Sequence, residues 1–444
     1  MPTSSAPLSR RRLLIGASAG LLLLPLAACF QGETVAVSPA SAPVAPTDAP
    51  AAITPSAPAV RLASTSAPTA SAVAPTAGSA SSPEVQLVPL TEAEESKVQR
   101  WQRQGWKTNF EVKSIDLREI KQAAAARDVI PPIDVPKHVS LAEGDEFLDD
   151  REPVAVFAHA GLSRAYPLQI LTWHEIVNDV VGGDPVLVTY CPLCNTAIGF
   201  LRVVDGQTLR FGVSANLRIS NMVMWDDLTE SFWQQSTGEA IVGGMTGTQL
   251  EFLPLSIVSW SAFKESFPEG LALSRDTGKR RDYGTNPYGG YDSSGWPFLF
   301  DGPFDPRLRP LERVVTLNLN GDQMAYSFLQ LQVMPVIHDS VGGQPLVVFW
   351  SPGTVSALDA SRISDSDDVG SAGVFSPLVD GESLTFVSAT GEIRDEKTDS
   401  VWNTLGLAIG GPLAGTRLEP VVHGNDFWFA WAGFWPDTRV YGEE

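Results

Sequence analysis

Residues 186–194 read VLVTYCPLC, and this stretch decides how the rest of the chain is interpreted. Its first five residues are apolar, β-branched or aromatic, which predicts a largely buried strand. The strand ends at Cys191, and Cys194 follows three positions later. At that spacing two sulfur atoms can reach either one metal ion or each other. The stretch therefore predicts a core strand that delivers two thiols to a single site.

The N-terminal residues 1–28 have the pattern of an export signal. Arg10, Arg11 and Arg12 precede the apolar run 13–24, and a Leu-Ala-Ala sequence then precedes Cys29. This end resembles a bacterial lipobox, which implies cleavage before Cys29 and attachment of lipid to its sulfur. The run is short and ends in proline and small residues, which disfavours a plain transmembrane anchor. The segment SRRRLL also resembles a twin-arginine signal, which implies export after folding.

Composition excludes several classes of protein. The formal charge is −20, so a nucleic-acid partner is not expected and membrane contact should come from the lipid on Cys29. Residues 29–89 are Ala, Pro, Ser and Thr with almost no charge, which predicts a disordered tether between the membrane and the folded part. With Cys29 lipidated, Cys191 and Cys194 are the only thiols left in an oxidising compartment. The pair must then be a disulfide, a metal-binding pair or a redox couple.

Residues 90–152 are expected to form an N-terminal extension of helix and loop. The helix is predicted over Leu90–Arg127, with Thr91 as its cap and Glu94 three residues further on. Residues 127–150 are rich in proline and predict a loop. Regular structure is expected to resume at Pro153.

The chain then repeats itself, which is its strongest organisational feature. Two motif pairs recur 160 residues apart, and two more recur at a slightly larger offset. The pairs are GLSRAY (161–166) with GDQMAY (321–326), DVVGGDP (179–185) with DSVGGQP (339–345), TESFW (229–233) with TDSVW (398–402), and GTQLE (247–251) with GTRLE (415–419).

These repeats predict two tandem related modules. We call residues 153–273 the first module, residues 274–310 the inter-module loop and residues 311–444 the second module. Apolar residues after Pro167, from Ile170 to Val181, have helical spacing, and Trp260–Phe267 predicts a second helix capped by Ser259. The remainder of each module is strand and turn. The fold class expected is α+β, mostly antiparallel β, with a degenerate second module.

The duplication allows a comparison within one chain. Glycine turns, the Ala-Tyr pair and the tryptophan are kept in the second module, as framework positions should be. When the two modules are aligned, the positions of Cys191, Cys194 and His174 in the first module correspond to Ser351, Thr354 and Met334 in the second. Three chemically active side chains are therefore lost together, which predicts one site in the first module.

A metal site needs more ligands than two cysteines. His174 is the first candidate, although a lone inward histidine is often only a core residue. Met222 and Met224 are predicted to lie on one face of a strand, and their thioethers would favour copper(I) over zinc. Of the two, Met224 is included in the predicted metal site. Two other interpretations stay open. The pair could be a thiol-disulfide redox centre, although the sequence leaves little room for the long helix of a thioredoxin fold, or it could be a bracing disulfide.

The inter-module loop is the second place where function is expected. It is dense in polar and aromatic side chains, and loops carry function more often than cores do. We regard it as a candidate ligand loop, with these residues as candidate contacts: Asp276, Arg281, Asp282, Tyr283 and Tyr288. A plain structural crossover is the alternative.

Several of these motifs together resemble one bacterial family, domain-of-unknown-function family 3179. The motifs are WHEIVND (173–179), TYCPLCNTA (189–197), FGVS (211–214), TESFWQQ (229–235) and SRDTG (274–278). The resemblance covers about Ile130–Tyr441, and Ala215 departs from it where a glycine is expected. It implies that Cys191, Cys194 and His174 are family hallmarks, but it implies no substrate or reaction.

The function expected from the sequence is that of an extracytoplasmic lipoprotein that binds copper or zinc through Cys191, Cys194 and His174. The alternatives are a thiol-disulfide oxidoreductase that uses Cys191 and Cys194, and a surface ligand-binding or scaffold protein with a structural disulfide. Whether the protein is an enzyme is left open.

Overall fold

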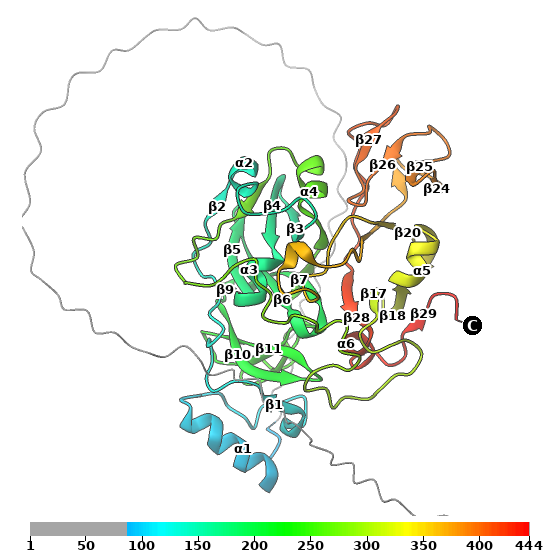
Figure 1. Cartoon of the computed structure of the whole chain (residues 1–444). Helices are drawn as coiled ribbons and strands as arrows, with labels where there is room; N and C mark the ends of the chain where they lie inside the picture. The colour runs from blue at the N-terminus through cyan, green and yellow to red at the C-terminus, as the bar shows by residue number, and fades with distance from the viewer. Residues whose placement is uncertain (1–86, 444) are drawn as a thin grey trace, which may run out of the picture. The chain divides into compact units, whose positions relative to one another are not determined.

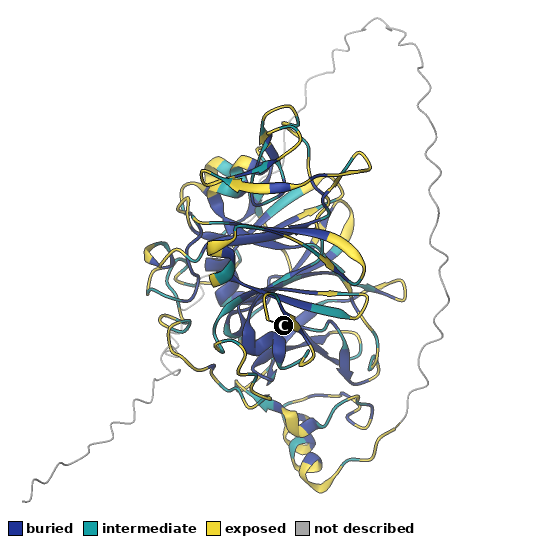
Figure 2. Ribbon diagram, turned by 90° about the vertical axis from the view of Figure 1, so that its right-hand side faces the viewer, coloured by how far each residue is buried: buried dark blue, intermediate teal, exposed yellow. Residues whose placement is uncertain are grey.

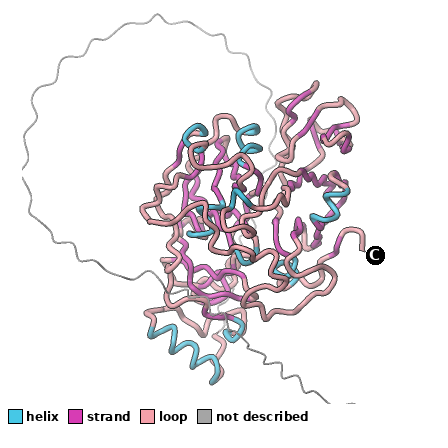
Figure 3. Tube along the Cα trace, viewed as in Figure 1, coloured by secondary structure: helices cyan, strands magenta, loops and turns pink. Residues whose placement is uncertain are grey.

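The computed structural model describes residues 87–443. Strands dominate, helices are short, and most strand pairs are antiparallel, as expected from the sequence (Figure 3). The signal, Cys29 and nearly all of the tether lie outside the described residues. Within 87–443, no helix combines the length and hydrophobicity that a membrane span requires.

The first module begins with a five-stranded sheet in the order β15-β3-β4-β16-β2. The strands are β15 (Ser256–Ser259), β3 (Pro153–His159), β4 (Leu162–Pro167), β16 (Leu271–Leu273) and β2 (His138–Val139). Helices α2 (Leu141–Gly144) and α4 (Trp260–Ser266) accompany it, and Ser259 caps α4 by accepting a hydrogen bond from the Ala262 N–H. Strand β2 and helix α2 lie within residues 127–150, so the prediction that this stretch is loop and that regular structure resumes only at Pro153 was wrong.

A four-stranded sheet, β14-β7-β6-β5, carries the stretch quoted first. Its strands are β14 (Glu251–Leu253), β7 (Thr196–Leu201), β6 (Asp184–Cys191) and β5 (Ile176–Val181). Helix α3 (Leu168–His174) enters it, and a small hairpin, β8 (Val203–Val204) with β9 (Gln207–Thr208), follows it. Strand β6 is buried from Val186 to Cys191, which confirms the predicted core strand.

The third sheet of this part has the order β1-β10-β11-β12-β13. Its strands are β1 (Ile120–Gln122), β10 (Phe211–Arg218), β11 (Asn221–Asp226), β12 (Phe232–Gln234) and β13 (Ala240–Val242). Helix α1 (Glu92–Arg103) and the short 3-10 helix η1 (Leu117–Glu119) lie against it (Figure 1). The contact is aromatic, because Trp101 stacks on Phe110 and meets Phe232 edge-on.

The second module contains three sheets and a hairpin. The first sheet is β28 (Gly424–Phe427), β17 (Arg313–Leu319), β18 (Asp322–Ser327) and β29 (Arg439–Val440). The second is β19 (Val336–Val341), β20 (Gln344–Ser351) and β21 (Ser371–Phe375). The third is β24 (Phe386–Ala389), β25 (Glu392–Asp395), β26 (Val401–Trp402) and β27 (Ala408–Gly410). The remaining elements are β22 (Leu378–Val379), β23 (Glu382–Ser383), α5 (Phe328–Val333), α6 (Trp428–Ala432) and η3 (Ile363–Asp365).

Hairpins in the two modules have equal registers at an offset of 160 residues. Strand pair β3–β4 places Val154 opposite Pro167, and β17–β18 places Val314 opposite Ser327. Likewise β5–β6 and β19–β20 have the same register at that offset. Both modules also contain one parallel pair at matching positions, β4–β16 and β18–β29.

Two helices are shorter than the sequence predicted. Helix α1 has the expected capping box of Thr91 and Glu94 but ends at Arg103, since Gly105 adopts a left-handed φ of 88° that stops it. Helix α3 ends at His174, because Glu175 is left-handed at φ 58° and turns the chain into β5. Val177 and Val181 therefore lie on a strand, and the predicted helical spacing beyond His174 was wrong.

The largest core is shared between the two modules. Most of its members belong to the first module, and Ala357, Leu358, Phe427, Phe429 and Ala430 join from the second. Figure 2 shows buried strands in the interior, with exposed residues concentrated in turns and loops. The site described next lies at this shared core.

Candidate functional site

The two cysteines lie at a tight turn between β6 and β7. Cys191 is the last residue of β6 and pairs with Thr196 of β7, so only residues 192–195 form the connection. Pro192 opens a single 3-10 turn that ends at Cys194, because its fixed φ suits that position. Asn195 then takes the left-handed conformation (φ 53°) that asparagine tolerates better than most residues. Both cysteines are free thiols and both are buried.

The tip of the β10–β11 hairpin packs over this turn. The Cys194 thiol donates a hydrogen bond to the Ser220 carbonyl at 3.5 Å, and the Ser220 hydroxyl donates to the Phe298 carbonyl at 2.5 Å. Ile219 and Ser220 form the hairpin turn with φ values of 52° and 63°. A β-branched residue at positive φ is strained, so surrounding contacts must hold the tip in place.

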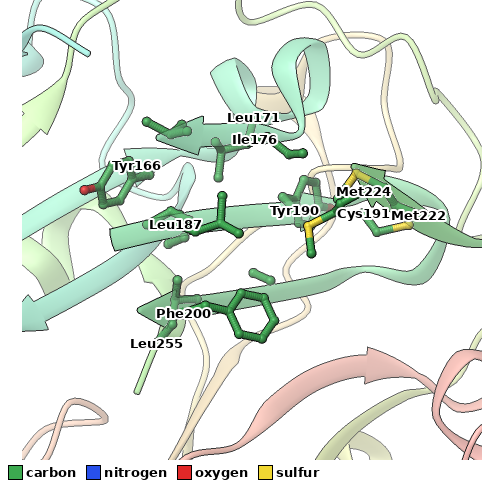
Figure 4. Packing of buried hydrophobic residues seen from close by; sticks show 14 of the residues in the cluster. Tyr166, Leu171, Ile176, Leu187, Tyr190, Cys191, Phe200, Met222, Met224 and Leu255 are labelled. Carbon is green, nitrogen blue, oxygen red and sulfur yellow. The ribbon is translucent and has the colours of Figure 1, made fainter. Parts of the chain in front are cut away.

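Two methionines of β11 bring thioethers to the same place. Met222 and Met224 are 1% and 0% exposed and belong to the same buried cluster as Cys191 and Cys194. Figure 4 shows Met222, Met224 and Cys191 together at one end of that cluster. Burial raises the pKa of the Cys194 thiol well above its ordinary value, and the neighbouring Cys191 raises it further. Cys194 is therefore a neutral thiol, and it shares one buried cluster with Cys191 and the two thioethers.

His174 is buried at the end of α3, and both of its ring nitrogens are occupied. Nδ1 lies 2.6 Å from the Pro131 carbonyl, and Nε2 lies 2.6 Å from the Tyr283 hydroxyl. Because a carbonyl only accepts, Nδ1 carries the proton, and Nε2 accepts from Tyr283 in the neutral ring. Burial lowers the pKa of His174, and Arg281 and Lys279 add to the effect, which favours this neutral form.

The structure thus brings together some of the predicted ligands and separates another. Cys191, Cys194 and Met224 share one cluster with Met222, whereas His174 is engaged with the Tyr283 hydroxyl. Within residues 87–443, no group of three His, Cys, Asp or Glu side chains is close enough to hold one metal ion. Sulfur from methionine is consequently the additional ligand type that the geometry offers to the cysteines.

Glu175 is a residue of this region that the sequence analysis did not single out. Its side chain is buried, and the Tyr288 hydroxyl donates a long hydrogen bond of 3.5 Å to Oε1. Burial raises the pKa of Glu175 to about 8, although the contact with Tyr288 opposes that shift. The only signal in the sequence was its position beside His174, because a carboxylate after a short helix ordinarily points to solvent.

The inter-module loop crosses the cysteine turn and covers it. The Tyr291 hydroxyl donates to the Leu193 carbonyl at 2.9 Å, within the turn itself. Among the candidate contacts, Tyr283 and Tyr288 reach inward to His174 and Glu175. Asp276 instead forms an exposed ion pair with Lys137.

The two remaining candidate contacts have no role at the turn. The side chain of Arg281 donates to the carbonyl of the preceding Arg280, and Asp282 is exposed. The tyrosines of the inter-module loop, rather than its charges, are therefore the part that meets the site.

The corresponding turn of the second module is built differently. Ser351 matches Cys191 in register, but residues 352–370 connect it to Ser371, which replaces the tight turn by a long loop. Thr354 therefore lies on that loop. The sequence alignment predicted that it would take the position of Cys194, and this prediction was wrong. The Gly290 and Tyr291 N–H groups donate to carbonyls of this loop, at Asp359 and Leu358.

The hairpin that carries the methionines is also shortened there. Strands β10 and β11 continue to the pair Arg218–Asn221, whereas β24 and β25 end at Ala389–Glu392. At the corresponding positions, residues 311–444 therefore contain neither a tight turn like that of residues 191–196 nor a hairpin as long as β10–β11. In each module a buried tryptophan, Trp233 or Trp402, donates its indole N–H to an aspartate.

Comparison with known proteins gives one match. A family model described as "Protein of unknown function (DUF3179)" matches residues 127–438, which include the cysteine turn, the inter-module loop and most of both modules. No curated protein and no solved structure shows a significant match to the chain. Since the model covers well over half of the sequence, this chain belongs to the DUF3179 family of proteins of unknown function.

Proposed function

We propose that this protein is an exported, lipid-anchored protein that binds copper(I) through Cys191 and Cys194, with a thioether of Met222 or Met224 as a further ligand. The observation that carries the proposal is that Cys191, Met222 and Met224 lie together at one end of a buried cluster that also contains Cys194. Soft sulfur ligands select copper(I), and a site without water protects that oxidation state. Binding replaces each thiol proton by a metal–sulfur bond and releases the proton to solvent.

Zinc, the other metal expected from the sequence, is less well supported. Structural zinc sites use four ligands drawn from cysteine, histidine and carboxylates. Among residues 87–443, no three such side chains approach one another closely enough. His174 would join the cysteines only after its Nε2 had left the Tyr283 hydroxyl. Copper(I) does not require His174, because it accepts two or three sulfur ligands.

Thiol-disulfide exchange is less well supported than metal binding. A redox cysteine is normally exposed to its substrate and has a lowered pKa. Cys191 and Cys194 are 2% and 0% exposed, and the pKa of Cys194 is raised by burial. The copper(I) titration described next also tests whether the two cysteines form a structural disulfide or a redox couple.

Copper(I) binding is expected at one equivalent per chain and should depend on a thioether of β11. We would add copper(I) under anaerobic conditions in competition with a chromogenic copper(I) chelator and count free thiols before and after reduction. Met222→Leu combined with Met224→Leu should weaken binding by about 10-fold or more, because both soft ligands are lost at nearly constant volume.

Met324→Leu is the matched control, since Met324 is equally buried but lies on β18 of the second module. It should bind copper(I) like the unchanged protein. Equal affinity of the control and the double variant would exclude the methionines. Absence of copper together with absence of free thiols would leave a disulfide, and its reduction potential would separate a redox couple from a brace.

We propose that residues 1–28 are removed on export, by the twin-arginine route, and that Cys29 carries the lipid. The support is the basic, apolar and small-residue pattern that ends at Cys29. Cys29→Ser should abolish acylation and move the protein from the membrane fraction to the soluble fraction, because each buried methylene of a lipid adds about 0.8 kcal/mol of membrane affinity. Intact mass and fractionation measure both. Unchanged protein whose mass shows residues 1–28 still attached, or no lipid on Cys29, would contradict this assignment.

We further propose that the two modules arose by internal duplication, after which the second one lost the site. The equal registers of the paired hairpins support this, as do the matching aspartate–tryptophan contacts. The predicted partners of the protein are the membrane, through the lipid on Cys29, and an unidentified small molecule or protein.

A further inference from the structure

A cavity of about 550 Å³ lies at the junction of the two modules, and its lining contains none of the cysteines and methionines described above. Its walls come from β7 and β14 of the first module and from β17, β28 and α6 of the second. A volume of this size falls within the usual range for a small-molecule site. The cavity is therefore large enough to be examined as a binding site in its own right.

The floor of the cavity contains a buried carboxyl group. Asp426 of β28 is 3% exposed, and its oxygens accept hydrogen bonds from the hydroxyls of Thr196 and Thr316. Glu239 contributes a second carboxyl group to the lining. The lining contains no lysine or arginine, and within the described residues neither carboxyl group forms an ion pair. The cavity is consequently an acidic site without a protein cation.

His423 adds to the lining a buried ring nitrogen that has no hydrogen-bond partner among the described residues. It is 7% exposed, and its Nδ1 lies 2.8 Å from the Val421 carbonyl, to which it must donate. Nε2 of the neutral ring is then an acceptor, and it has no hydrogen-bond partner among the described residues. This nitrogen has almost no accessible surface, so it does not open onto the cavity, and burial lowers the pKa of His423, which favours the neutral ring in this wall.

The remaining wall is aromatic and apolar. Trp431 and Trp435 stack with their ring centroids 4.0 Å apart, and Phe252 faces the cavity from β14. Aromatic faces attract cations, most strongly where water is excluded. The combination of carboxyl groups and aromatic rings matches a ligand that has a positively charged group and an apolar body.

The aspartate is not part of the repeated framework. Asp426 lies opposite Val314 in the β17–β28 ladder, and the matching position of the β3–β15 ladder, opposite Val154, is Val258. Valine suffices for the same packing in the first module. A buried carboxyl group at this register position therefore needs a reason other than the fold.

We propose that this cavity binds a small organic cation, such as a primary amine with an aromatic or aliphatic body, whose ammonium group pairs with Asp426. A bare metal ion fits less well, because no three of the described His, Cys, Asp and Glu side chains converge here or elsewhere in residues 87–443. The two proposed sites use different ligand residues, so either assignment can fail alone.

The test compares three probes that share one body and differ in charge. Titration calorimetry of the purified protein with 2-phenylethylamine should show binding, whereas 2-phenylethanol and 3-phenylpropionate should bind at least about 10-fold more weakly, because a charge-assisted hydrogen bond is lost or reversed. Asp426→Asn should weaken binding of the amine by a similar factor, because the ammonium group loses its charged partner.

Glu251→Gln is the matched control, since Glu251 is exposed on β14 and outside the lining, yet its replacement removes the same charge. It should not alter affinity. If Asp426→Asn fails to fold, Glu239→Gln and Trp435→Ala at the cavity wall serve instead. Equal binding of amine and alcohol would overturn the proposal, as would no binding of the amine at about 10 mM.

Discussion

Replacing Cys191 by serine is expected to abolish copper(I) binding. Cys191 ends β6 and is one of only two thiols among the described residues, so its loss leaves Cys194 as the single thiolate ligand. Even partners outside the ligand set commonly change metal affinity 10–100-fold, and loss of a ligand should cost at least about 100-fold. The chelator competition used for the methionine variants measures this directly.

Cys191→Ala should have the same effect and separates ligand loss from a hydroxyl buried in an apolar site. Ser351→Ala is the internal control, because Ser351 has the register position of Cys191 in the second module. The control should bind copper(I) normally, and all three variants should unfold cooperatively. Full copper(I) occupancy in folded Cys191→Ser would refute a site built on the cysteine pair.

The largest expected loss of stability comes from Glu94→Gln in helix α1. Glu94 is 2% exposed and forms an ion pair with Lys113, whose side chain is also buried. It additionally accepts hydrogen bonds from the Thr91 and Leu117 N–H groups. Glutamine keeps the shape but leaves the Lys113 charge buried and unpaired, which should cost about 3–5 kcal/mol of unfolding free energy. Urea unfolding measures the change.

Glu95→Gln is the control, since Glu95 occupies the next position of the same helix and is exposed. Its effect should stay within about 0.5 kcal/mol. The double change of Glu94 to leucine and Lys113 to methionine removes both charges and should recover much of the lost stability. A loss in Glu94→Gln no larger than that of Glu95→Gln would show that the ion pair does not support the fold.

The same carboxylate sets an acid dependence. Burial raises the pKa of Glu94, but Lys113 and the backbone N–H groups lower it more, so that it falls from 4.5 to about 2. Below pH 4.5 the unfolded chain therefore binds the proton before the folded chain does. The contribution of Glu94 is present above pH 4.5 and is lost as pH falls towards 2. Glu94→Gln should lack this part of the pH dependence.

Local patterns in the sequence predicted local structure, and they failed where a single backbone conformation intervened. Thr91 and Glu94 were expected to begin a helix and do so, because a capping box needs only residues three apart. The end of that helix depended on Gly105, and the end of α3 depended on a left-handed Glu175. A non-glycine residue in that conformation has no signature in the sequence.

The candidate site could be predicted only in part for a related reason. Cys191 and Cys194 are near neighbours, so their spacing alone placed them together. The partner of His174 is Tyr283, which lies far along the chain, and no spacing rule identifies it. The cavity at the module junction is harder still to predict from the sequence, because its floor depends on a contact between Thr196 and Asp426, which belong to different modules.

The shared core has a consequence for the order in which the chain can fold. Phe427, Phe429 and Ala430 are the last residues to join a core whose other members, apart from Ala357 and Leu358, lie in residues 133–273. A ribosome adds about 5–20 residues per second, so these residues follow the end of the first module by roughly 10–30 s. Throughout that interval the nascent chain exposes an incomplete apolar surface. Its maturation should therefore depend on holding chaperones during synthesis, with final closure after the chain has been released.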